Sequence, residues 1–265
     1  MNSAQNTPIR FTKASACGND FLIVNGVDAA ADLAALTRLL CDRHNGVGAD
    51  GVEWIFADPH ADAMARLINA DGSEAEISGN GTRCVAAEMC SRSEKQEVVI
   101  RTGAGLKTCR LLSQHYPAFE FETELGVPVV GEELTIDVNS FRAIGRNVSM
   151  GNPHYVIMTE KFRENWQHEA ALIQSQAQFP QGTNVEYVVV RGPNQIEIRL
   201  FERGVGETQS SGTGSCAAAV AAIASGHVTS PVTVVAPGGG QTVRWEGHVY
   251  LRGPATLICR GEFFI

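Results

Sequence analysis

The sequence lacks the features that would connect it to a membrane or to nucleic acid. It has no run of about 18 consecutive apolar residues, the length that a membrane-spanning helix needs. Its formal net charge is −8 and it has no dense block of Lys and Arg, which argues against a nucleic-acid-binding surface. The first eight residues contain neither a basic nor an apolar segment, so we expect no signal peptide. We therefore expect neither a membrane nor a nucleic acid as a partner.

The cysteines and histidines also lack the spacing of a disulfide framework or a metal site. The seven cysteines are odd in number and contain no CxxC pair, which suits a reducing compartment, so we expect a cytoplasmic protein. Cys84 and Cys90 are six positions apart, a spacing that suits no common metal site, and the seven histidines show no ligand spacing. We expect no bound metal.

The composition that is present is that of a globular protein long enough for two domains, with 265 residues, 44% of them hydrophobic and 19% charged. Two short glycine-rich turns, SGNGT at 78–82 and SGTGS at 211–215, each lead into a small-residue stretch that favours a helix. Their first serines lie 133 positions apart, and a glutamate precedes each by four positions. A motif that recurs at half the chain length indicates two related halves.

A glycine-rich turn followed by a helix is typical of an anion site. The first backbone N–H groups of a helix have no partner within the helix, and they point along its positive dipole end. Two such helix ends that face each other would bind one carboxylate and place a side chain on either side of the carbon that bears it. The alternative is that Ser78 and Ser211 are ordinary N-caps, since serine is common there. The repetition favours the anion site.

Short strands outnumber helices in both halves, which predicts the α+β class. One helix, capped by Asp28, is expected to carry four leucines on one face: Leu33, Leu36, Leu39 and Leu40. A second helical stretch spans 161–178.

The apolar pattern relaxes at 113–117, and we place the domain boundary there. The N-terminal domain then spans 1–115 and the C-terminal domain 116–254. The last residues, 255–265, are expected to pair back with the first domain and complete it.

Six polar residues lie beside glycines at the ends of expected strands: Asn19, Asn69, Asn152, Asn184, Glu202 and Arg203. Each alone is the usual kind of turn residue. Brought together at the two turns, they would bind a small zwitterionic molecule, because Arg203 can hold a carboxylate through two hydrogen bonds and Glu202 can accept from an ammonium group. A phosphate would require more cations, so an amino acid with more than one charged group fits better.

The order of several motifs along the chain resembles one known family. The motifs are Gly18-Asn19-Asp20-Phe21, 69–76 (NADGSEAE), Gly79-Asn80-Gly81 with Arg83-Cys84, Gly151-Asn152-Pro153-His154, 183–186 (TNVE), 202–208 (ERGVGET) and Gly212-Thr213-Gly214. In this order they are similar to those of the diaminopimelate epimerase family, over nearly the whole chain.

The resemblance implies two pseudo-symmetric domains, each a β-barrel-like sheet around a central helix, with the active site in the cleft between them. It also implies inversion of the α-carbon of LL-diaminopimelate without a cofactor, which gives the meso form for lysine and peptidoglycan precursor synthesis. By this resemblance, the substrate's α-carboxylate would be held by the backbone N–H groups of Gly79, Asn80, Gly212 and Thr213. The six polar residues named above would hold the other polar ends of the substrate, with His154 and Glu202 beside the acid/base pair.

The chain departs from the family at the acid/base pair itself. The family has cysteine directly before Gly-Asn-Gly and before Gly-Thr-Gly, where this chain has Ser78 and Ser211. A thiol with a pKa of about 8.5 can approach neutrality at a helix N-terminus. A hydroxyl resembles water at about 15.7, and a helix dipole contributes at most about 2 kcal/mol, roughly 1.5 pKa units. A serine would therefore need a neighbouring base, and His154 and Glu202 are the candidates.

Three explanations of the serines stay open. They are Cys→Ser changes that trap an ordinary epimerase, or native residues of an epimerase that works slowly or through another proton relay. Alternatively, the protein has left this reaction and is an amino-acid-binding protein or an isomerase of another polar acid. Cys17 and Cys216 lie near the motifs and are weaker candidates for a replacement base. The expected partner is a small amino-acid substrate, and a homodimer stays open.

Overall fold

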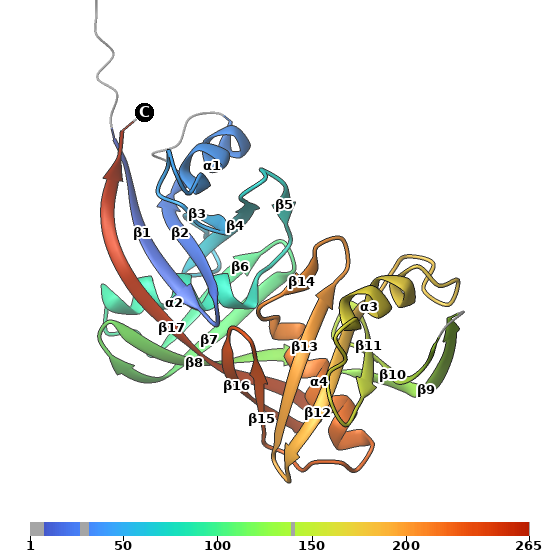
Figure 1. Ribbon diagram of the computed structural model, residues 1–265. Coiled ribbons are helices and arrows are strands. Elements are labelled where there is room, and N and C mark those ends of the chain that lie inside the picture. Colours follow the sequence, from blue (N-terminus) through green and yellow to red (C-terminus); the bar gives the residue numbers. More distant parts are fainter. Residues whose placement is uncertain (1–7, 27–31, 139–140, 265) are drawn as a thin grey trace, which may run out of the picture. The chain divides into compact units, whose positions relative to one another are not determined.

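A computed structural model describes residues 8–26, 32–138 and 141–264 of the chain (Figure 1). Contacts divide the chain into two compact units: unit 1 contains Met1–Thr123 and Pro254–Ile265, and unit 2 contains Glu124–Gly253. The chain leaves unit 1 within strand β8 and returns to it within strand β17. The sequence-based domain limits stay a prediction. Within the described ranges, no helix is long and apolar enough to cross a membrane.

Unit 1 is built on a closed ring of strand pairings. Its strands are β1 (Ile9–Ala16), β2 (Asn19–Asn25), β3 (Gly51–Phe56), β4 (Ala63–Asn69), β5 (Glu74–Ala75), β6 (Glu97–Thr102), β7 (Gly105–His115), β8 (Ala118–Gly126) and β17 (His248–Phe263). The ring runs β1–β2–β3–β4–β6–β7–β8–β17 and back to β1, with parallel pairs at β2–β3 and β4–β6. A closed ring leaves no sheet edge unpaired.

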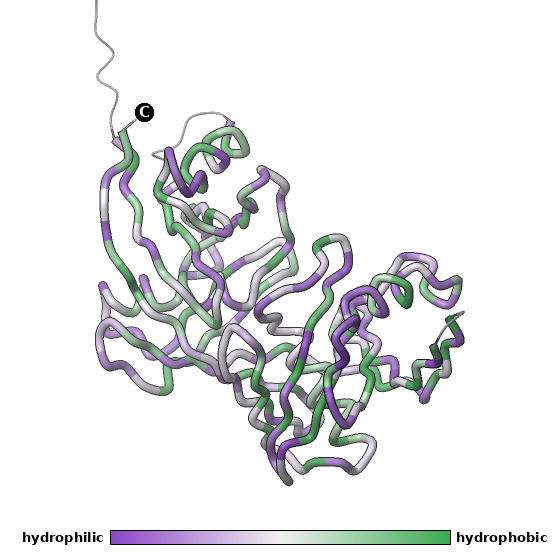
Figure 2. The backbone as a smooth tube through the Cα atoms, in the orientation of Figure 1, coloured by the Kyte–Doolittle hydropathy of each residue, from purple (hydrophilic) through white to green (hydrophobic). Residues whose placement is uncertain are grey.

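The two helices of unit 1 cover opposite faces of the strands. Helix α1 (Leu33–Cys41) packs on Val52 and Trp54 of β3, while α2 (Gly79–Ser91) packs against the other face, with its central residues Cys84–Ala87 fully buried. The alternation of a strand explains this division, because successive side chains point to opposite faces. Figure 2 shows hydrophobic and hydrophilic segments mixed along the backbone of the strands. The small residues of α2 allow the surrounding strands to approach it closely.

Unit 2 repeats this plan. Its strands are β9 (Val129–Val138), β10 (Phe141–Ser149), β11 (Pro153–Met158), β12 (Asn184–Gly192), β13 (Gln195–Glu202), β14 (Gly206–Thr208), β15 (Val232–Ala236) and β16 (Gly239–Glu246). Helix α4 (Gly212–Ala224) is the central helix, buried from Gly214 to Ala222. Helix α3 (Trp166–Gln174) packs on the opposite face, with Tyr155 and Tyr187.

The two units match at one constant spacing. Helices α1 and α3, and likewise α2 and α4, begin and end 133 positions apart. The same spacing relates the parallel pairs: Phe21 lies opposite Gly51 in unit 1, and His154 lies opposite Asn184 in unit 2. The predicted α+β fold, with two related halves that each wrap a sheet around a central helix, is confirmed.

Some local predictions need correction. The N-cap of α1 is Asp32, whose carboxylate accepts a hydrogen bond of 2.9 Å from the backbone N–H of Ala35; the predicted cap, Asp28, lies outside the described residues. Leu39 is 54% exposed, because the buried face of α1 contains Thr37 in its place. The helix predicted at 161–178 is shorter, Trp166–Gln174.

Strand β10 was not among the predicted strands. A Cβ on Gly145, within this strand, would lie 2.7 Å from the ring of Tyr155. Close packing therefore requires the glycine. Strand β17 pairs with β1, with Ile9 opposite Phe263.

Candidate active site

In unit 1 the candidate site begins at the N-terminus of α2. Ser78 is the N-cap, and its Oγ accepts a hydrogen bond of 3.1 Å from the backbone N–H of Gly81. The Ser78 carbonyl accepts from the backbone N–H and from the hydroxyl of Thr82, both at 2.8 Å. This fixes the hydroxyl at the positive end of the helix dipole, beside the N–H groups of the first turn.

A chain of hydrogen bonds connects the two predicted asparagines of this half-site. Asn80 donates from Nδ2 to Oδ1 of Asn19 at 2.8 Å, and its own Oδ1 accepts from the buried guanidinium of Arg83. Arg83 also donates from Nε to the carbonyl of Pro254 at 3.2 Å. Both amides therefore have a defined orientation, since each has an acceptor and a donor partner.

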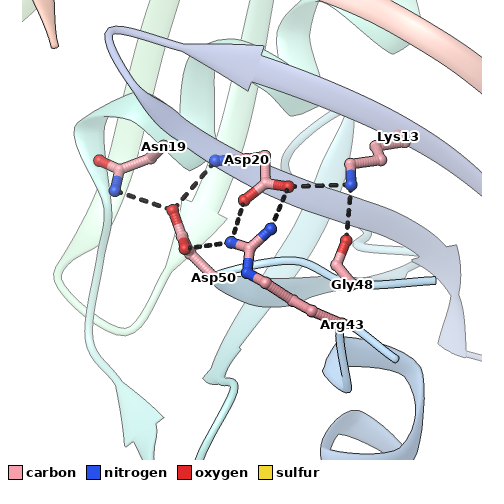
Figure 3. Close-up of polar contacts among 6 residues, drawn as sticks. All are labelled: Lys13, Asn19, Asp20, Arg43, Gly48 and Asp50. Carbon is pink, nitrogen blue, oxygen red and sulfur yellow. Dashed lines mark hydrogen bonds and ion pairs between the residues drawn. The ribbon is translucent and has the colours of Figure 1, made fainter. Parts of the chain in front are cut away.

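An ionic network fixes the other end of this chain of amides (Figure 3). Asn19 donates from Nδ2 to Oδ2 of Asp50 at 3.1 Å, and Asp50 accepts from Arg43 at 2.8 Å. Arg43 and Lys13 both pair with Asp20, each with a closest contact of 2.9 Å. Partial burial raises the pKa of Asp20, but the hydrogen bonds from Arg43 and Lys13 outweigh it and hold the pKa below the ordinary value. The turn that carries Asn19 is thus fixed by the ion pairs of Asp20 and Asp50.

The structure does not bring Asn69 into this chain of amides. Asn69 ends β4 opposite Gly51, and its Nδ2 donates to Oγ of Ser73 at 3.1 Å. Ser73 in turn donates to Oδ1 of Asp71 at 2.6 Å. Among the described residues, the contacts of the Asn69 amide are those of a turn.

A buried carboxyl lies behind the first turn of α2. Glu53 of β3 is 3% exposed, and a Cβ on Gly81 would lie 2.0 Å from its Oε1 and 3.3 Å from Cβ of Ser78. Burial, the single resolved cause, raises the pKa of Glu53 to about 8. Gly81 is thus required, because any side chain there would displace the carboxyl.

In unit 2 the second serine has a carboxylate partner. Ser211 is the N-cap of α4, and its Oγ accepts from the backbone N–H of Gly214 at 3.2 Å. A hydrogen bond with Ser211 also reaches Glu202 at the end of β13. Burial raises the pKa of Glu202, more than the hydrogen bond with Ser211 and the charge of His154 lower it. The hydroxyl thus has a proton acceptor next to it.

His154 lies in a fully buried arrangement of polar groups. Its Nδ1 is 2.7 Å from Oε1 of Glu186, its Nε2 is 3.0 Å from Oδ1 of Asn152, and the side chains of His154 and Glu186 are each 1% exposed. Burial raises the pKa of Glu186, although His154 opposes this. One ring nitrogen of His154 thus faces a carboxylate oxygen and the other an amide oxygen, which fixes the orientation of the ring.

Of the remaining predicted residues of unit 2, Asn152 and Thr213 join the set around His154, whereas Asn184 and Arg203 contact each other. Asn152 donates from Nδ2 to the hydroxyl of Thr213 at 3.4 Å, and Thr213 is in the first turn of α4, after Gly212. Asn184 accepts at Oδ1 from the backbone N–H of Arg203 at 2.9 Å. The guanidinium of Arg203 is exposed and donates to the carbonyl of Gln181 at 3.0 Å. Unit 2 therefore contains the pair Ser211 and Glu202, the pair Asn184 and Arg203, and the connected set His154, Asn152 and Thr213.

Known proteins resemble the chain over almost its whole length. The family described as diaminopimelate epimerase matches residues 11–128 and 146–258. A diaminopimelate epimerase from Pelotomaculum thermopropionicum is 37% identical and covers 96% of this chain and 99% of its own. One from Methanococcus maripaludis is 32% identical and covers 97% of this chain and 100% of its own.

The chain belongs to the diaminopimelate epimerase family.

Solved structures extend the likeness of fold. A phenazine biosynthesis protein of the PhzF family from Bacillus anthracis has a TM-score of 0.74 at 15% identity, covering 97% of this chain and 99% of its own. A hydroxyproline epimerase from Agrobacterium vitis has a TM-score of 0.71 at 14% identity, covering 97% and 91%. Membership of the diaminopimelate epimerase family makes the chain an isomerase by kind, as the sequence analysis predicted.

Two buried glutamates beside the glycine turns of this diaminopimelate epimerase homologue, Glu53 and Glu186, were not among the predicted site residues. Glu53 and Glu186 are 133 positions apart, and each precedes its half-site serine by 25 positions. That repeated spacing was a signal in the sequence. It is hard to recognise, because a glutamate within an alternating strand usually faces solvent.

Proposed function

We propose that the chain is an amino-acid epimerase that converts LL-diaminopimelate to the meso form without a cofactor, slowed by serine at both acid/base positions. The observation that carries the proposal is the hydrogen bond of Ser211 with Glu202 at the N-terminus of α4. It supplies what a serine needs in this reaction, a base beside the hydroxyl. The product would serve lysine and peptidoglycan precursor synthesis in the cytoplasm.

The chemistry follows from the weakness of the hydroxyl as an acid. A free alkoxide on Ser211 is out of reach, since a hydroxyl with a pKa near that of water, about 15.7, lies far above what a helix dipole can offset. Ser211 therefore takes the α-proton only while it passes its own proton to Glu202. The raised pKa of Glu202 makes this carboxylate a stronger base than an exposed one.

Binding is proposed to use the helix N-termini for the α-carboxylate and the polar residues for the rest of the substrate. The N–H donors are those of Gly79, Asn80, Gly212 and Thr213. The side chains proposed for the other polar ends are Asn19, Asn69, Asn152, Asn184, Glu202 and Arg203. His154 supports Asn152 and contributes positive charge beside Glu202.

Hydrogen exchange at the α-carbon tests the function directly. The intact chain is incubated with LL-diaminopimelate in deuterium oxide, and loss of the α-hydrogen signal is followed by NMR. We expect slow exchange in the wild type and at least about 100-fold faster exchange with Ser78→Cys plus Ser211→Cys, since a thiol needs no relay. Ser175→Cys, at the C-terminus of α3, controls for an added thiol.

A second candidate is an amino-acid-binding protein without epimerase activity. It is favoured by the half-site of Ser78. The residue of unit 1 that corresponds to Glu202 is Asn69, whose amide cannot act as a base. Binding of diaminopimelate by calorimetry with no exchange, even in the double cysteine variant, would establish this candidate. Absence of both binding and exchange would point to another polar acid as substrate.

A further inference from the structure

The position of Glu53 carries an inference about Ser78. Its Oε1 lies against Gly81, whose backbone N–H donates a hydrogen bond to the Ser78 hydroxyl. The Cβ of Ser78 also lies close to Gly81. The Glu53 carboxyl and the Ser78 side chain thus both flank one residue of the first turn of α2. Gly81 leaves the space between them free of a side chain.

The surroundings of Glu53 are apolar. Its neighbours across the sheet are Ile23 on β2 and Leu67 on β4, both part of the core around α2. On α2 the charge of Glu53 acts on Cys84, which is fully buried and whose pKa burial raises far above its ordinary value. A carboxyl in such a place favours its protonated form, so it holds a proton near neutral pH.

We propose that Glu53 is the proton store for Ser78, and that the pair replaces the single thiol expected at this position. The proposal rests on the proposed function. In the protonating direction, the Ser78 O–H bond breaks as the proton goes to the substrate carbanion, and the proton of the Glu53 carboxyl re-forms the O–H bond. In the reverse direction Ser78 takes the α-proton and the Glu53 carboxylate receives the hydroxyl proton.

This relay removes the obstacle that a hydroxyl presents. No alkoxide accumulates, because the charge ends on a carboxylate, and the group that titrates is Glu53. Its pKa of about 8 lies close to that of a cysteine thiol, about 8.5. Glu53 acts through Ser78, so it is a positioning and relay residue rather than one that touches the substrate.

The counterpart of Glu53 in unit 2 is Glu186, whose carboxyl has a histidine as its partner. Glu186 lies against Gly214 as Glu53 lies against Gly81, with 3.0 Å from its Oε1 to a Cβ placed there. Its Oε1 is bound to His154, and Ser211 has Glu202 in addition. Phe21 takes the position in unit 1 that His154 has in unit 2, opposite Gly51 as His154 is opposite Asn184, so unit 1 has no histidine there to bind its carboxyl.

The test compares the effect of Glu53→Gln in two chains. Exchange at the α-carbon is measured for Glu53→Gln with serine at position 78 and for Glu53→Gln together with Ser78→Cys. We expect a loss of about 100-fold in the serine chain and a loss at least tenfold smaller in the chain with Ser78→Cys, since a thiol carries its own proton. Equal losses in both chains would show a merely structural role and overturn the proposal.

Two controls separate this proposal from the proposed function. Glu169→Gln changes another buried carboxylate, on α3, and should leave exchange unaltered. Exchange in the double cysteine variant but none in the wild type would overturn the relay while the epimerase function stands. If no variant exchanges, the function fails. The pairing is then judged by ¹³C NMR titration of the Glu53 carboxyl, whose midpoint Ser78→Ala should shift; an unchanged midpoint contradicts the pairing.

Discussion

The two half-sites have the same backbone plan and different proton-carrying groups. In unit 2 a carboxylate, Glu186, is paired with His154, and a second, Glu202, is bonded to the serine. In unit 1 the corresponding positions are Glu53, Phe21 and Asn69, so one carboxyl remains and it has no histidine. The comparison teaches that a repeated helix N-terminus fixes where a serine lies, while the neighbouring strands decide which groups exchange protons with it.

The two half-sites are also held in place by different forces. Unit 2 relies on a buried pair, in which His154 and Glu186 are each 1% exposed. Unit 1 relies on a chain of amides that ends on the more exposed network of Arg43, Asp20 and Asp50. Buried pairs depend strongly on both partners, whereas surface pairs contribute little individually. Variants should therefore affect unit 2 more severely.

The largest effect is expected when unit 2 is given the residue of unit 1, by His154→Phe. This leaves the Glu186 carboxyl buried without its partner, and a loss of about 3–5 kcal/mol in the free energy of unfolding is expected at pH 8. The loss should be smaller at pH 5.5, because the raised pKa of Glu186 lets it take up a proton. Urea unfolding of the intact chain at both pH values measures this. Adding Glu186→Gln should recover part of the loss; a cost below about 1 kcal/mol would refute the difference drawn here.

A second effect distinguishes the carboxyl of unit 1 by its pH dependence. The pKa of Glu53 is raised from 4.5 to about 8, so between these values the folded chain keeps a proton that the unfolded chain has lost. Stability therefore falls as pH rises through this range, by up to about 1.4 kcal/mol per pH unit. Glu53→Gln removes this dependence. The free energy of unfolding of the variant, relative to that of the wild type, should therefore rise by about 2–3 kcal/mol as the pH increases from 5.5 to 7.5.

The matched control for this pH effect is Glu197→Gln. Ion pairing with Arg191 lowers the pKa of Glu197, so its carboxylate is ionised in both folded and unfolded chains throughout this range. The difference between this variant and the wild type should stay constant from pH 5.5 to 7.5. Parallel curves for Glu53→Gln and Glu197→Gln would mean that Glu53 titrates normally.

Local signals in the sequence were enough for the architecture and for the two helix N-termini. The repeated Ser-Gly-X-Gly motif predicted two related halves. Both serines cap helices in the same way, because each hydroxyl accepts a hydrogen bond from the backbone N–H three residues later. The central helices follow from runs of small residues, which fit inside a sheet. These features are local, so spacing and residue type suffice to predict them.

Features that depend on register could not be predicted in the same way. Whether Glu53 faces α2 or α1 depends on a shift of one residue in β3, since alternate side chains point to opposite faces and both faces are covered here. The contact of Asn19 with Asp50 joins residues that are 31 positions apart. The glycine in β10 is explained by the ring of Tyr155, a neighbour that only the fold supplies.

The smallest effect compares the two serines as helix caps. Ser78→Ala should cost about 1 kcal/mol, the usual value for a lost N-cap bond. Ser211→Ala should cost about 2 kcal/mol, because Glu202 also loses its hydrogen bond. Asn165→Ala is the control, since this N-cap of α3 makes no side-chain bond and should cost little. Urea unfolding of the three variants measures these losses in the free energy of unfolding. Equal losses for the two serine variants would mean that the hydrogen bond with Glu202 does not stabilise the fold.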